Sequence, residues 1–484
     1  MSIPTTEPPR TARATPHARW PALTVVAVAQ LMVALDATIV NIALPSAQAD
    51  LGFGDDARQW VVTGYTCALA GLLLLGGRIA DRIGRRRAFL GGLAGFSLAS
   101  ALAGAAPSFG WLVAGRAAQG AFAAVLTPTA LSLIAVTFTT PRERARAFGV
   151  YGAVASSGAA MGLLLGGGLT EFAGWRWCLF VNVGIAGLAF LAGRAVLPAQ
   201  DGYPATRVDA LSGLLVTGGL AAVVLACSQA AGHGWTSPRV LVPGAIGVLA
   251  VAVFLWRQTR SPQPLLPVWL LHDRSRAGAY LAAAVAVVGA FGMFLMLTYH
   301  FQVVLGWSPV RAGVAFLPLS VAVAASAYGL GSRLLPRVAP RALIVPGLVL
   351  AAAGLGVLGT LPPSSGYLTP ILPAELLLGT GMGLVVTPAI SVATSGVDPR
   401  HAGVAAAVAN AAMQVGGSVG TAALNSVAVA ATTRYVGAHG PSATALVHGF
   451  STATTVSAVA LLVTAAAAAA LIRTPHPTST QVLR

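Results

Sequence analysis

The chain has 484 residues, of which 56% are hydrophobic and only 9% are charged. Soluble domains carry roughly 25% charged residues, so this composition excludes a soluble enzyme. The net charge of +16 comes from short Arg clusters between apolar blocks, which argues against a nucleic-acid partner. Cys67, Cys178 and Cys227 lie inside apolar blocks without CxxC spacing, so neither a disulfide nor a metal site is predicted.

Apolar blocks of about 20 residues, the length that a helix needs to cross a bilayer, recur along the whole chain. The residues before the first block are polar and Pro-rich, and we expect them to be disordered. The first block is too long for a signal peptide and is expected to stay as the first helix. The blocks predict fourteen transmembrane helices, near 20–44, 57–79, 88–106, 111–137, 147–170, 176–197, 210–231, 239–256, 277–300, 310–331, 342–361, 368–393, 402–430 and 446–472.

The distribution of Arg tests this count, because loops rich in Arg face the cytoplasm and a missed helix would scramble the alternation. Of the 29 basic residues, which are all Arg, 23 fall on the side of the N-terminal tail and five on the other side. Arg116 lies within a predicted helix. The Arg-rich side is therefore predicted to be the cytoplasmic side of a bacterial plasma membrane, with both termini on it.

Two stretches of the chain resemble each other: VLTPTALSLIAVTFTTPRERARAFGVYGAV from Val125 and VVTPAISVATSGVDPRHAGVAAAV from Val385. Each has a Thr-Pro pair, a Pro-Arg turn and a Gly-Val start to a helix rich in small residues. Two similar halves are typical of transporters whose pathway lies between two bundles. Chance similarity among Ala/Gly/Val-rich helices is the alternative.

The repeat predicts an all-α integral membrane fold of two six-helix bundles plus two extra central helices. The expected divisions are a disordered cytoplasmic tail over 1–19, an N-terminal bundle over 20–197, two linking helices with their loops over 198–276, a C-terminal bundle over 277–472 and a cytoplasmic tail over 473–484.

Charged side chains inside apolar blocks stand out, because each costs roughly 2.5–3.5 kcal/mol to insert. Asp36 lies in the first predicted helix, where a carboxyl group facing a wet cavity can take up a proton on one side and release it on the other. Arg116 keeps its charge and can favour ionisation of a nearby carboxylate. We predict that both residues take part in proton coupling, with a structural polar contact as the alternative for each.

Further polar residues within the apolar blocks are candidates for the lining of a substrate cavity: Asn41, Tyr65, Gln119 and Glu375. Ordinary packing is the alternative for the first three. For Glu375, a role in binding substrate or protons competes with a merely interfacial position near the outer end of the twelfth helix.

The loop GGRIADRIGRRR, which starts at Gly76, combines one acid with five Arg between the second and third predicted helices. Membrane topology alone explains the excess of Arg. Asp81 and Gly84 are not needed for anchoring, and a carboxylate near a helix N-terminus can form a latch through the helix dipole. The residues of this loop therefore leave two interpretations open, a topogenic anchor and a gating latch.

With these features in order, the chain resembles the major facilitator superfamily, specifically its fourteen-helix branch of drug:proton antiporters. The resemblance extends over nearly the whole chain apart from the tails and rests on LDATIVNIALP from Leu35, QWVVTGYTCALAGLLLLGGRIADRIGRRR from Gln59, RAAQG from Arg116, GWRWCLFVNV from Gly174, GHGWTSP from Gly232 and HFQVVLGWSPVRAGVAFLP from His300. It implies that Asp36 and Arg116 belong to proton coupling. It also implies a cytoplasmic gating motif of Gly77, Asp81, Arg82, Gly84, Arg85 and Arg86.

The resemblance further implies that the fifth helix is the antiporter hinge. Its candidate hinge residues are Gly152, Gly158, Gly162, Gly166 and Gly167. The chain departs from the family pattern here, because Gly162-Leu163 stands where the family usually has Gly-Pro. The loss of Pro removes a preset kink, although the glycines can keep the helix pliable.

Together these features predict a proton-coupled transporter that exports amphiphilic or cationic small molecules by alternating access. Its expected partners are the substrate, protons and the lipid bilayer, and we expect a monomer without cofactors. The chain has no Walker-type loop and no nucleophile–base pairing that would indicate ATP-driven transport or an enzyme. An importer or uniporter of a narrow substrate, suggested by the missing Pro at position 163, is the alternative, and a membrane sensor without transport is a more remote one.

Overall fold

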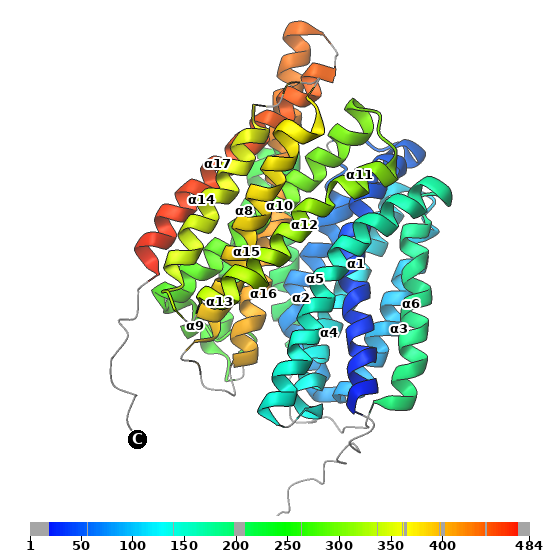
Figure 1. Ribbon diagram of the computed structural model, residues 1–484, viewed down its shortest axis with the longest axis vertical. Coiled ribbons are helices and arrows are strands. Elements are labelled where there is room, and N and C mark those ends of the chain that lie inside the picture. Colours follow the sequence, from blue (N-terminus) through cyan, green and yellow to red (C-terminus); the bar gives the residue numbers. More distant parts are fainter. Residues whose placement is uncertain are drawn as a thin grey trace, which may run out of the picture.

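The computed structural model describes residues 19–55, 57–138, 140–197, 209–262, 264–335, 337–360, 362, 365–395, 397, 402–440 and 443–472. This part consists of helices and connecting loops and contains no strand. The long helices run side by side in two groups (Figure 1). Of the two predicted tails, only Arg19, the first residue of α1, falls within the described ranges.

Six helices form the first group, the N bundle. In chain order they are α1 (Arg19–Leu51), α2 (Trp60–Ile83), α3 (Arg85–Gly104), α4 (Phe109–Thr137), α5 (Pro141–Phe172) and α6 (Trp177–Val196). α1 packs along α5, α2 along α4, and α3 against both α4 and α6. Phe89, Leu93 and Phe96 on α3 are completely buried in the apolar core that these helices enclose.

The second group, the C bundle, starts after a short helix, α9 (Trp269–His272). Its elements are α10 (Arg274–Tyr299) with the π-helical turn η2 (His300–Val304), α11 (Pro309–Ala315), α12 (Leu317–Ala324), the π-helical segment η3 (Ala325–Gly331), α13 (Ser332–Leu334), α14 (Arg341–Leu358), the π-helical turn η4 (Tyr367–Ile371), α15 (Leu372–Thr394), α16 (Ala402–His439) and α17 (Ala443–Leu471). α10, α14 and α15 pack around a second apolar core.

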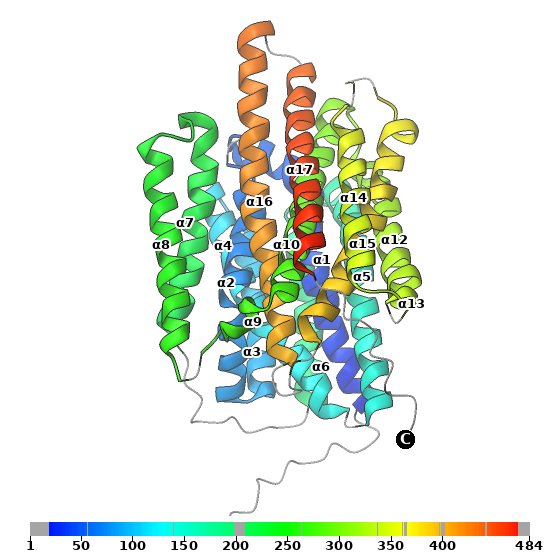
Figure 2. The ribbon, with the colours of Figure 1, turned by 90° about the vertical axis from the view of Figure 1, so that its left-hand side faces the viewer.

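A helical pair links the bundles. α7 (Ala210–His233) and α8 (Pro238–Arg260) pack on each other and stand at one edge of the molecule (Figure 2). α7 also contacts α2 of the N bundle and α16 of the C bundle, whereas α8 is turned outward and largely exposed. An apolar helix with an exposed outer face is what a lipid-facing position requires.

Thirteen helices of the described part are long and apolar enough to cross a membrane. The fourteenth predicted span is α5, which has 32 residues and starts with a charged turn, and whose described apolar part is Ala160–Phe172. All fourteen predicted spans therefore have a helix in the expected place. The predicted class, an all-α multi-span membrane protein, is confirmed.

Two predicted spans differ in detail from the observed helices. The span predicted near 310–331 is divided into α11, α12 and η3, with the first break at Phe316. Pro318 follows this break and has no backbone N–H, so it cannot continue the hydrogen-bond ladder of α11. α16 continues past the predicted end at 430 to His439 and projects beyond its neighbours (Figures 1 and 2).

Local sequence explains where several helices begin. Thr140, Asp209, Ser237, Asp273 and Ser308 each precede a helix and accept a hydrogen bond from a backbone N–H in its first turn. Three of them are followed by Pro at the first helical position, where the missing N–H has no partner to lose. These caps set the starts of α5, α7, α8, α10 and α11.

Candidate functional site

Asp36 lies near the middle of α1, and its side chain is completely buried in the N bundle. Its carboxylate accepts three hydrogen bonds. Nη1 of Arg116 lies 2.7 Å from Oδ2, while Nε2 of Gln119 and Nδ2 of Asn182 lie 3.0 and 2.7 Å from Oδ1. Two residues from α4 and one from α6 therefore surround a single carboxylate with donors.

Arg116 is 1% exposed and contacts four other residues. Besides Asp36, it donates from Nη1 to Oε1 of Gln119 at 2.9 Å and from Nε to the carbonyl oxygen of Val61 at 3.1 Å. Its guanidinium carbon lies 4.6 Å from the centre of the Tyr65 ring. A buried charge needs such partners, because an isolated ion in a medium of low dielectric constant is strongly destabilised.

The structure thus brings together Asp36, Arg116, Gln119 and Tyr65, which the sequence singled out one by one. It adds Asn182 and also Ser100, whose Oγ accepts a hydrogen bond from Nε2 of Gln119 at 2.5 Å. The amide group in the apolar sixth span was a signal for Asn182. Ser100 carried no signal, because a lone Ser in a helix of small residues is ordinary.

A second buried polar group joins the two bundles. We call the side of the molecule on which α1 begins the lower side, and the side on which α1 ends and α2 begins the upper side (Figure 1). On the upper side Arg58 is 2% exposed, donates to Oδ1 of Asn425 at 3.0 Å and lies over the Tyr299 ring at 4.2 Å. Nδ2 of Asn425 donates to the carbonyl oxygen of Asp55 at 3.1 Å and to Oε1 of Gln59 at 2.7 Å.

Further hydrogen bonds between the bundles also lie in the upper half. The hydroxyl of Tyr299 bonds to Gln48, and Nε2 of Gln302 donates to the carbonyl oxygen of Ile42 at 3.0 Å. The hydroxyls of Ser418 and Thr66 lie 2.7 Å apart. Within the described residues, the hydrogen bonds that join the N bundle to the C bundle therefore hold the upper half together.

Sequence reasoning missed this upper network. Arg58 was counted only as one of the few Arg residues on the Arg-poor side, and Asn425 is one polar residue in a helix of small ones. The pairing of residues separated by 367 positions became visible only when α2 and α16 were packed against each other.

The family model of the Major Facilitator Superfamily matches residues 26–421. The chain belongs to the major facilitator superfamily. It is 49% identical to the puromycin resistance protein pur8 of Streptomyces alboniger, over 94% of this chain and 91% of that relative. It is 40% identical to the cephamycin export protein CmcT of Amycolatopsis lactamdurans, over 84% of each chain.

A solved structure of the same fold is the bacterial homologue of the human lysosomal transporter Spinster, in an inward-facing and unoccupied conformation. The alignment covers 96% of this chain and 100% of that one, with a TM-score of 0.69 and 17% identity. The predicted family is confirmed. As a member of the major facilitator superfamily, the protein is a membrane transporter for small molecules and not an enzyme.

In this major facilitator protein, the predicted gating motif spans the end of α2, the turn at Gly84 and the start of α3. Gly84 has φ +91°, a conformation that favours glycine, and its N–H bonds to the carbonyl oxygen of Ala80 to end α2. Gly77 lies near the middle of the lower half of α2. A Cβ atom built on Gly77 would lie 3.8 Å from the Cβ atom of Pro128, which is an ordinary van der Waals contact. The turn is therefore tight, and α3 begins at the next residue, Arg85.

The charged members of the motif point to different places. Nη2 of Arg86 donates to the carbonyl oxygen of Arg194 at 2.6 Å, Arg85 is partly exposed, and Arg82 is exposed. Asp81 is also partly exposed and forms no ion pair with a described residue. The predicted latch through Asp81 stays a prediction.

The predicted hinge helix, α5, runs without a break from Pro141 to Phe172. Gly158, Gly162 and Gly166 form a stripe against α1, because Cβ atoms built on them would lie 2.8 Å from Ala34, 2.1 Å from Thr38 and 2.8 Å from Ile39. Close approach of α1 and α5 thus depends on glycine at these positions.

The other two hinge candidates do not belong to this stripe. A Cβ atom on Gly167 would lie 2.7 Å from the carbonyl oxygen of Pro309, so this glycine allows contact with α11 of the C bundle. Gly152 lies within α5, but its surroundings fall outside the described residues. Hinge motion of α5 stays a prediction for all five glycines.

The four predicted cavity residues are all buried. Gln119 and Tyr65 belong to the surroundings of Asp36, and Asn41, 3% exposed on α1, has an Nδ2 without a hydrogen-bond partner in the described part. Glu375 is completely buried in the first turn of α15, in the C bundle. The structure therefore separates Glu375 from the other three, and their contact with substrate stays a prediction.

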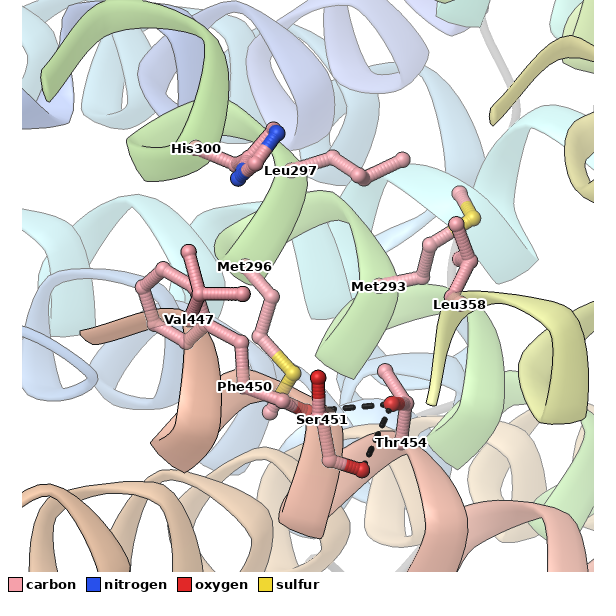
Figure 3. A pocket seen from close by; sticks show the side chains of 9 residues that line it. All are labelled: Met293, Met296, Leu297, His300, Leu358, Val447, Phe450, Ser451 and Thr454. Atoms are coloured by element: carbon pink, nitrogen blue, oxygen red, sulfur yellow. Dashed lines mark hydrogen bonds between the residues drawn. The ribbon is translucent and has the colours of Figure 1, made fainter. Parts of the chain in front are cut away.

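An apolar pocket lies in the C bundle between α10, α14 and α17 (Figure 3). It is lined by Met293, Met296, Leu297, His300, Leu358, Val447, Phe450, Ser451 and Thr454. His300 is buried, and its Nε2 has no hydrogen-bond partner in the described part of the chain. None of the predicted cavity residues lines this pocket.

Proposed function

We propose that this protein is a proton-coupled exporter of amphiphilic or cationic small molecules in the bacterial plasma membrane. The observation that carries the proposal is the completely buried carboxylate of Asp36, held by Arg116 inside a transporter fold. Membership of the major facilitator superfamily supports secondary transport. The resistance and export roles in the names of the relatives support export of an antibiotic or a similar drug.

Asp36 can either accept a hydrogen bond from Arg116 as a carboxylate or bind a proton, and binding the proton weakens its interaction with Arg116. In the ionised state the carboxylate accepts from Arg116, Gln119 and Asn182. Protonation removes the charge that Arg116 balances, so the guanidinium can leave Asp36 and keep only its bonds to Gln119 and to the carbonyl oxygen of Val61. A proton can in this way alter how α1, α4 and α6 are joined.

We propose that the structure corresponds to a state closed on the upper side by the Arg58–Asn425 network. The excess of Arg on the lower side supports a cytoplasmic position for this side and for both termini. Substrate enters from the cytoplasm or the inner leaflet, the bundles rock, and the upper network separates. Protonation of Asp36 from outside then resets the cycle.

The proton gradient is a sufficient driving force without any cofactor. One proton contributes about 2.3 kcal/mol per 100 mV of membrane potential and about 1.4 kcal/mol per pH unit. At 100 mV and one pH unit this sustains a gradient of several hundredfold for a substrate whose movement carries no opposing charge, since about 1.4 kcal/mol corresponds to tenfold.

The test is efflux of fluorescent dyes and drugs from energised cells that express the wild type or Asp36→Asn, with and without a protonophore. We expect efflux by the wild type, loss of efflux with the protonophore, and loss in Asp36→Asn. Asp273→Asn is the matched control, because it makes the same chemical change at an exposed residue and Asn caps a helix as well as Asp does.

Unchanged efflux by Asp36→Asn would remove Asp36 from the mechanism. The direction of transport is measured in inside-out vesicles, where export from the cell corresponds to uptake into the vesicle. Substrate flux out of the vesicles under the same gradient would instead favour an importer or uniporter. That alternative draws on Leu163 in place of Pro and on the unbroken α5, which carries no preset kink.

A further inference from the structure

The C bundle contains a second buried carboxyl group, which the mechanism above does not use. Glu375 lies in the first turn of α15 and is completely buried. Its Oε2 lies 3.1 Å from the hydroxyl oxygen of Tyr367, and its Oε1 has no hydrogen-bond partner in the described part of the chain. No described residue forms an ion pair with it. An ionised carboxylate in this position would be poorly compensated.

The hydroxyl of Tyr367 has one hydrogen and two neighbours. Its oxygen lies 2.7 Å from the carbonyl oxygen of Ala315 and 3.1 Å from Oε2 of Glu375. A carbonyl oxygen can only accept, so the bond to Ala315 uses the phenolic hydrogen. Each contact can be a full two-centre hydrogen bond only when Glu375 is protonated and donates to the phenolic oxygen.

Ionisation of Glu375 would change this arrangement. A carboxylate can only accept, so the phenolic hydrogen would turn from Ala315 to Glu375. Ala315 is the last residue of α11, where carbonyl groups lack a partner within the helix. Its carbonyl would then be without a donor.

Of the C-bundle elements, α11 makes the most extensive contact with α5, and α12 makes a smaller one. The backbone N–H of Val310 donates to Oε2 of Glu171 at 3.1 Å. A Cβ atom built on Gly313 would lie 2.4 Å from the carbonyl oxygen of Leu163, so the two helices touch backbone to backbone. The Tyr367 hydroxyl is therefore the link between Glu375 and a contact that joins the bundles on the upper side.

Aromatic packing holds the Tyr367 ring in place. Its centre lies 6.1 Å from that of Phe301 and 6.0 Å from that of Trp307, and these two rings stack at 5.0 Å. Arg311 lies over Trp307 at 4.0 Å. Since the ring is fixed on these sides, the hydrogen of the hydroxyl turns while the oxygen stays between its two neighbours.

Few other titratable groups are near Glu375. α12 contains none, and the elements packed on α15 otherwise carry Arg274, Arg276, Tyr280, Tyr299, Tyr328, Arg341, Arg434, Tyr435 and His439. Of these, Tyr299 belongs to the Arg58 network, and Arg434, Tyr435 and His439 lie in the projecting upper end of α16. In the aromatic cluster itself, Arg311 stacks on Trp307 and His300 lies 6.2 Å from Phe301. Tyr367 is the group in direct contact with the carboxyl.

We propose that Glu375 is a second proton-binding site of the transporter, and that its ionisation moves the Tyr367 hydrogen bond from Ala315 to Glu375 and loosens α11 on α5. In this step the carboxyl O–H bond breaks and the proton passes to water on the upper side, where Tyr367 is partly exposed. Tyr367 keeps its own hydrogen. The inference rests on the proposed proton-coupled transport, but its first test does not.

The first test is infrared titration of the purified protein in phosphatidylcholine vesicles. We expect the C=O stretching band of a protonated carboxyl group at neutral pH, and its loss at alkaline pH. Glu375→Gln should lack this band, whereas Asp36→Asn should keep it. An unchanged band in Glu375→Gln, or a band that does not respond to pH, would overturn the proposal. Either result is independent of whether Asp36→Asn affects efflux.

The second test reports the α5–α11 contact. The pair Glu171→Cys and Val310→Cys is cross-linked across a pH series in the wild-type, Glu375→Gln and Tyr367→Phe backgrounds. Thiol reactivity itself rises with pH, so each rate is divided by that in the Glu375→Gln background. We expect the ratio for the wild type to fall as the carboxyl band disappears.

Tyr367→Phe separates proton binding from its transmission. This variant keeps the carboxyl group and should retain the infrared band. It lacks the donor to Ala315 at every pH, so its cross-linking rate relative to Glu375→Gln should be low and should not change across the pH series. A pH profile in Tyr367→Phe equal to that of the wild type would refute the role of the hydroxyl. Equal profiles in the wild type and Glu375→Gln would refute the coupling to α11.

Discussion

The two bundles each bury a carboxyl group, and they surround it in opposite ways. In the N bundle, Asp36 accepts from three donors, one of them the positively charged Arg116. In the C bundle, Glu375 contacts a single hydroxyl, from Tyr367, whose hydrogen is already used by Ala315. The first site is built for an anion and the second for a neutral acid.

The comparison teaches that burial alone does not decide what a carboxyl group does in a membrane protein. Both side chains are completely buried. What differs is the number of hydrogens that point at them and the presence of a cation. Because the donors to Asp36 come from several helices, its protonation state affects how those helices pack. Glu375 acts through the hydrogen of one group, the Tyr367 hydroxyl.

The largest expected effect comes from removing the cation. Arg116→Ala leaves the Asp36 carboxylate buried without its counter-charge, and breaking a buried ion pair in this way costs about 3–5 kcal/mol. We expect a large fall in the thermal unfolding midpoint of the purified protein in detergent. The double variant Arg116→Ala, Asp36→Asn should recover much of that loss, and no recovery would mean that packing of the Arg116 side chain, not charge, is what matters.

A direct comparison of the two carboxyl groups uses isosteric amides. In Asp36→Asn, the buried Arg116 loses its counter-charge and an amide N–H replaces an acceptor among three donors, so we expect a cost approaching about 3–5 kcal/mol. In Glu375→Gln, the amide can donate to Tyr367 as the protonated acid does, so the change should stay below about 1 kcal/mol. Unfolding midpoints of the two variants at neutral pH check this order. A cost for Glu375→Gln as large as that for Asp36→Asn would contradict a neutral Glu375.

Removal of the Tyr367 hydroxyl should have a smaller effect. Tyr367→Phe leaves the Ala315 carbonyl without its donor, at a cost of about 1 kcal/mol. Because Tyr367 and Glu375 share one hydrogen-bond chain, the double variant Tyr367→Phe, Glu375→Gln should be less destabilised than the sum of the two single changes. Strict additivity of the unfolding free energies would show that the two groups do not interact.

The smallest effect is expected at Asp209, a carboxylate outside the membrane spans. It serves as a reference for the two buried carboxyl groups, Asp36 and Glu375. Partial burial raises the pKa of Asp209. Hydrogen bonds from Ser212 and the pairing with Arg257 lower this pKa by more than burial raises it, so the net pKa lies below its usual value. A lowered folded-state pKa means that the stabilisation is present above the unfolded pKa and is lost as pH falls through the folded one.

Asp209→Asn keeps the helix cap and removes the charge, so we expect a loss below about 1 kcal/mol at neutral pH. The difference from the wild type should vanish at acidic pH, where Asp209 is protonated in both the folded and unfolded chains. Unfolding midpoints across a pH series check this. A difference that grows on acidification would have the wrong sign for a lowered pKa.

Much of the fold could be read from the sequence, because hydrophobic length and Arg placement are properties of single segments. All fourteen spans were predicted, and most of their ends lie within a few residues of the observed ones. The ends of α1 and α16 are exceptions, because both helices continue further than predicted. The division of the tenth span into α11, α12 and η3 was missed, because Pro318 near the start of a helix is compatible with a plain helix as well as with a break.

The candidate site could be predicted only in part. Asp36 and Arg116 stand out because charge inside an apolar block is costly. Asn182, Ser100, Arg58 and Asn425 were missed, because a single polar residue or a loop Arg has many ordinary explanations. Glu375 was singled out but placed with the residues of the N bundle as a cavity candidate, since its distance from them is not a property of the sequence.

The sequence by itself determined that this protein crosses the membrane many times, which side carries the Arg residues and which charges the membrane must accommodate. These follow from the cost of placing each residue type in hydrocarbon, which each segment meets alone. Only the tertiary structure decided which donors meet Asp36, that Arg58 joins the bundles, and that the Tyr367 hydroxyl lies between Glu375 and Ala315. Hydrogen bonds depend on the direction and distance of single atoms, and helix packing sets these across hundreds of residues.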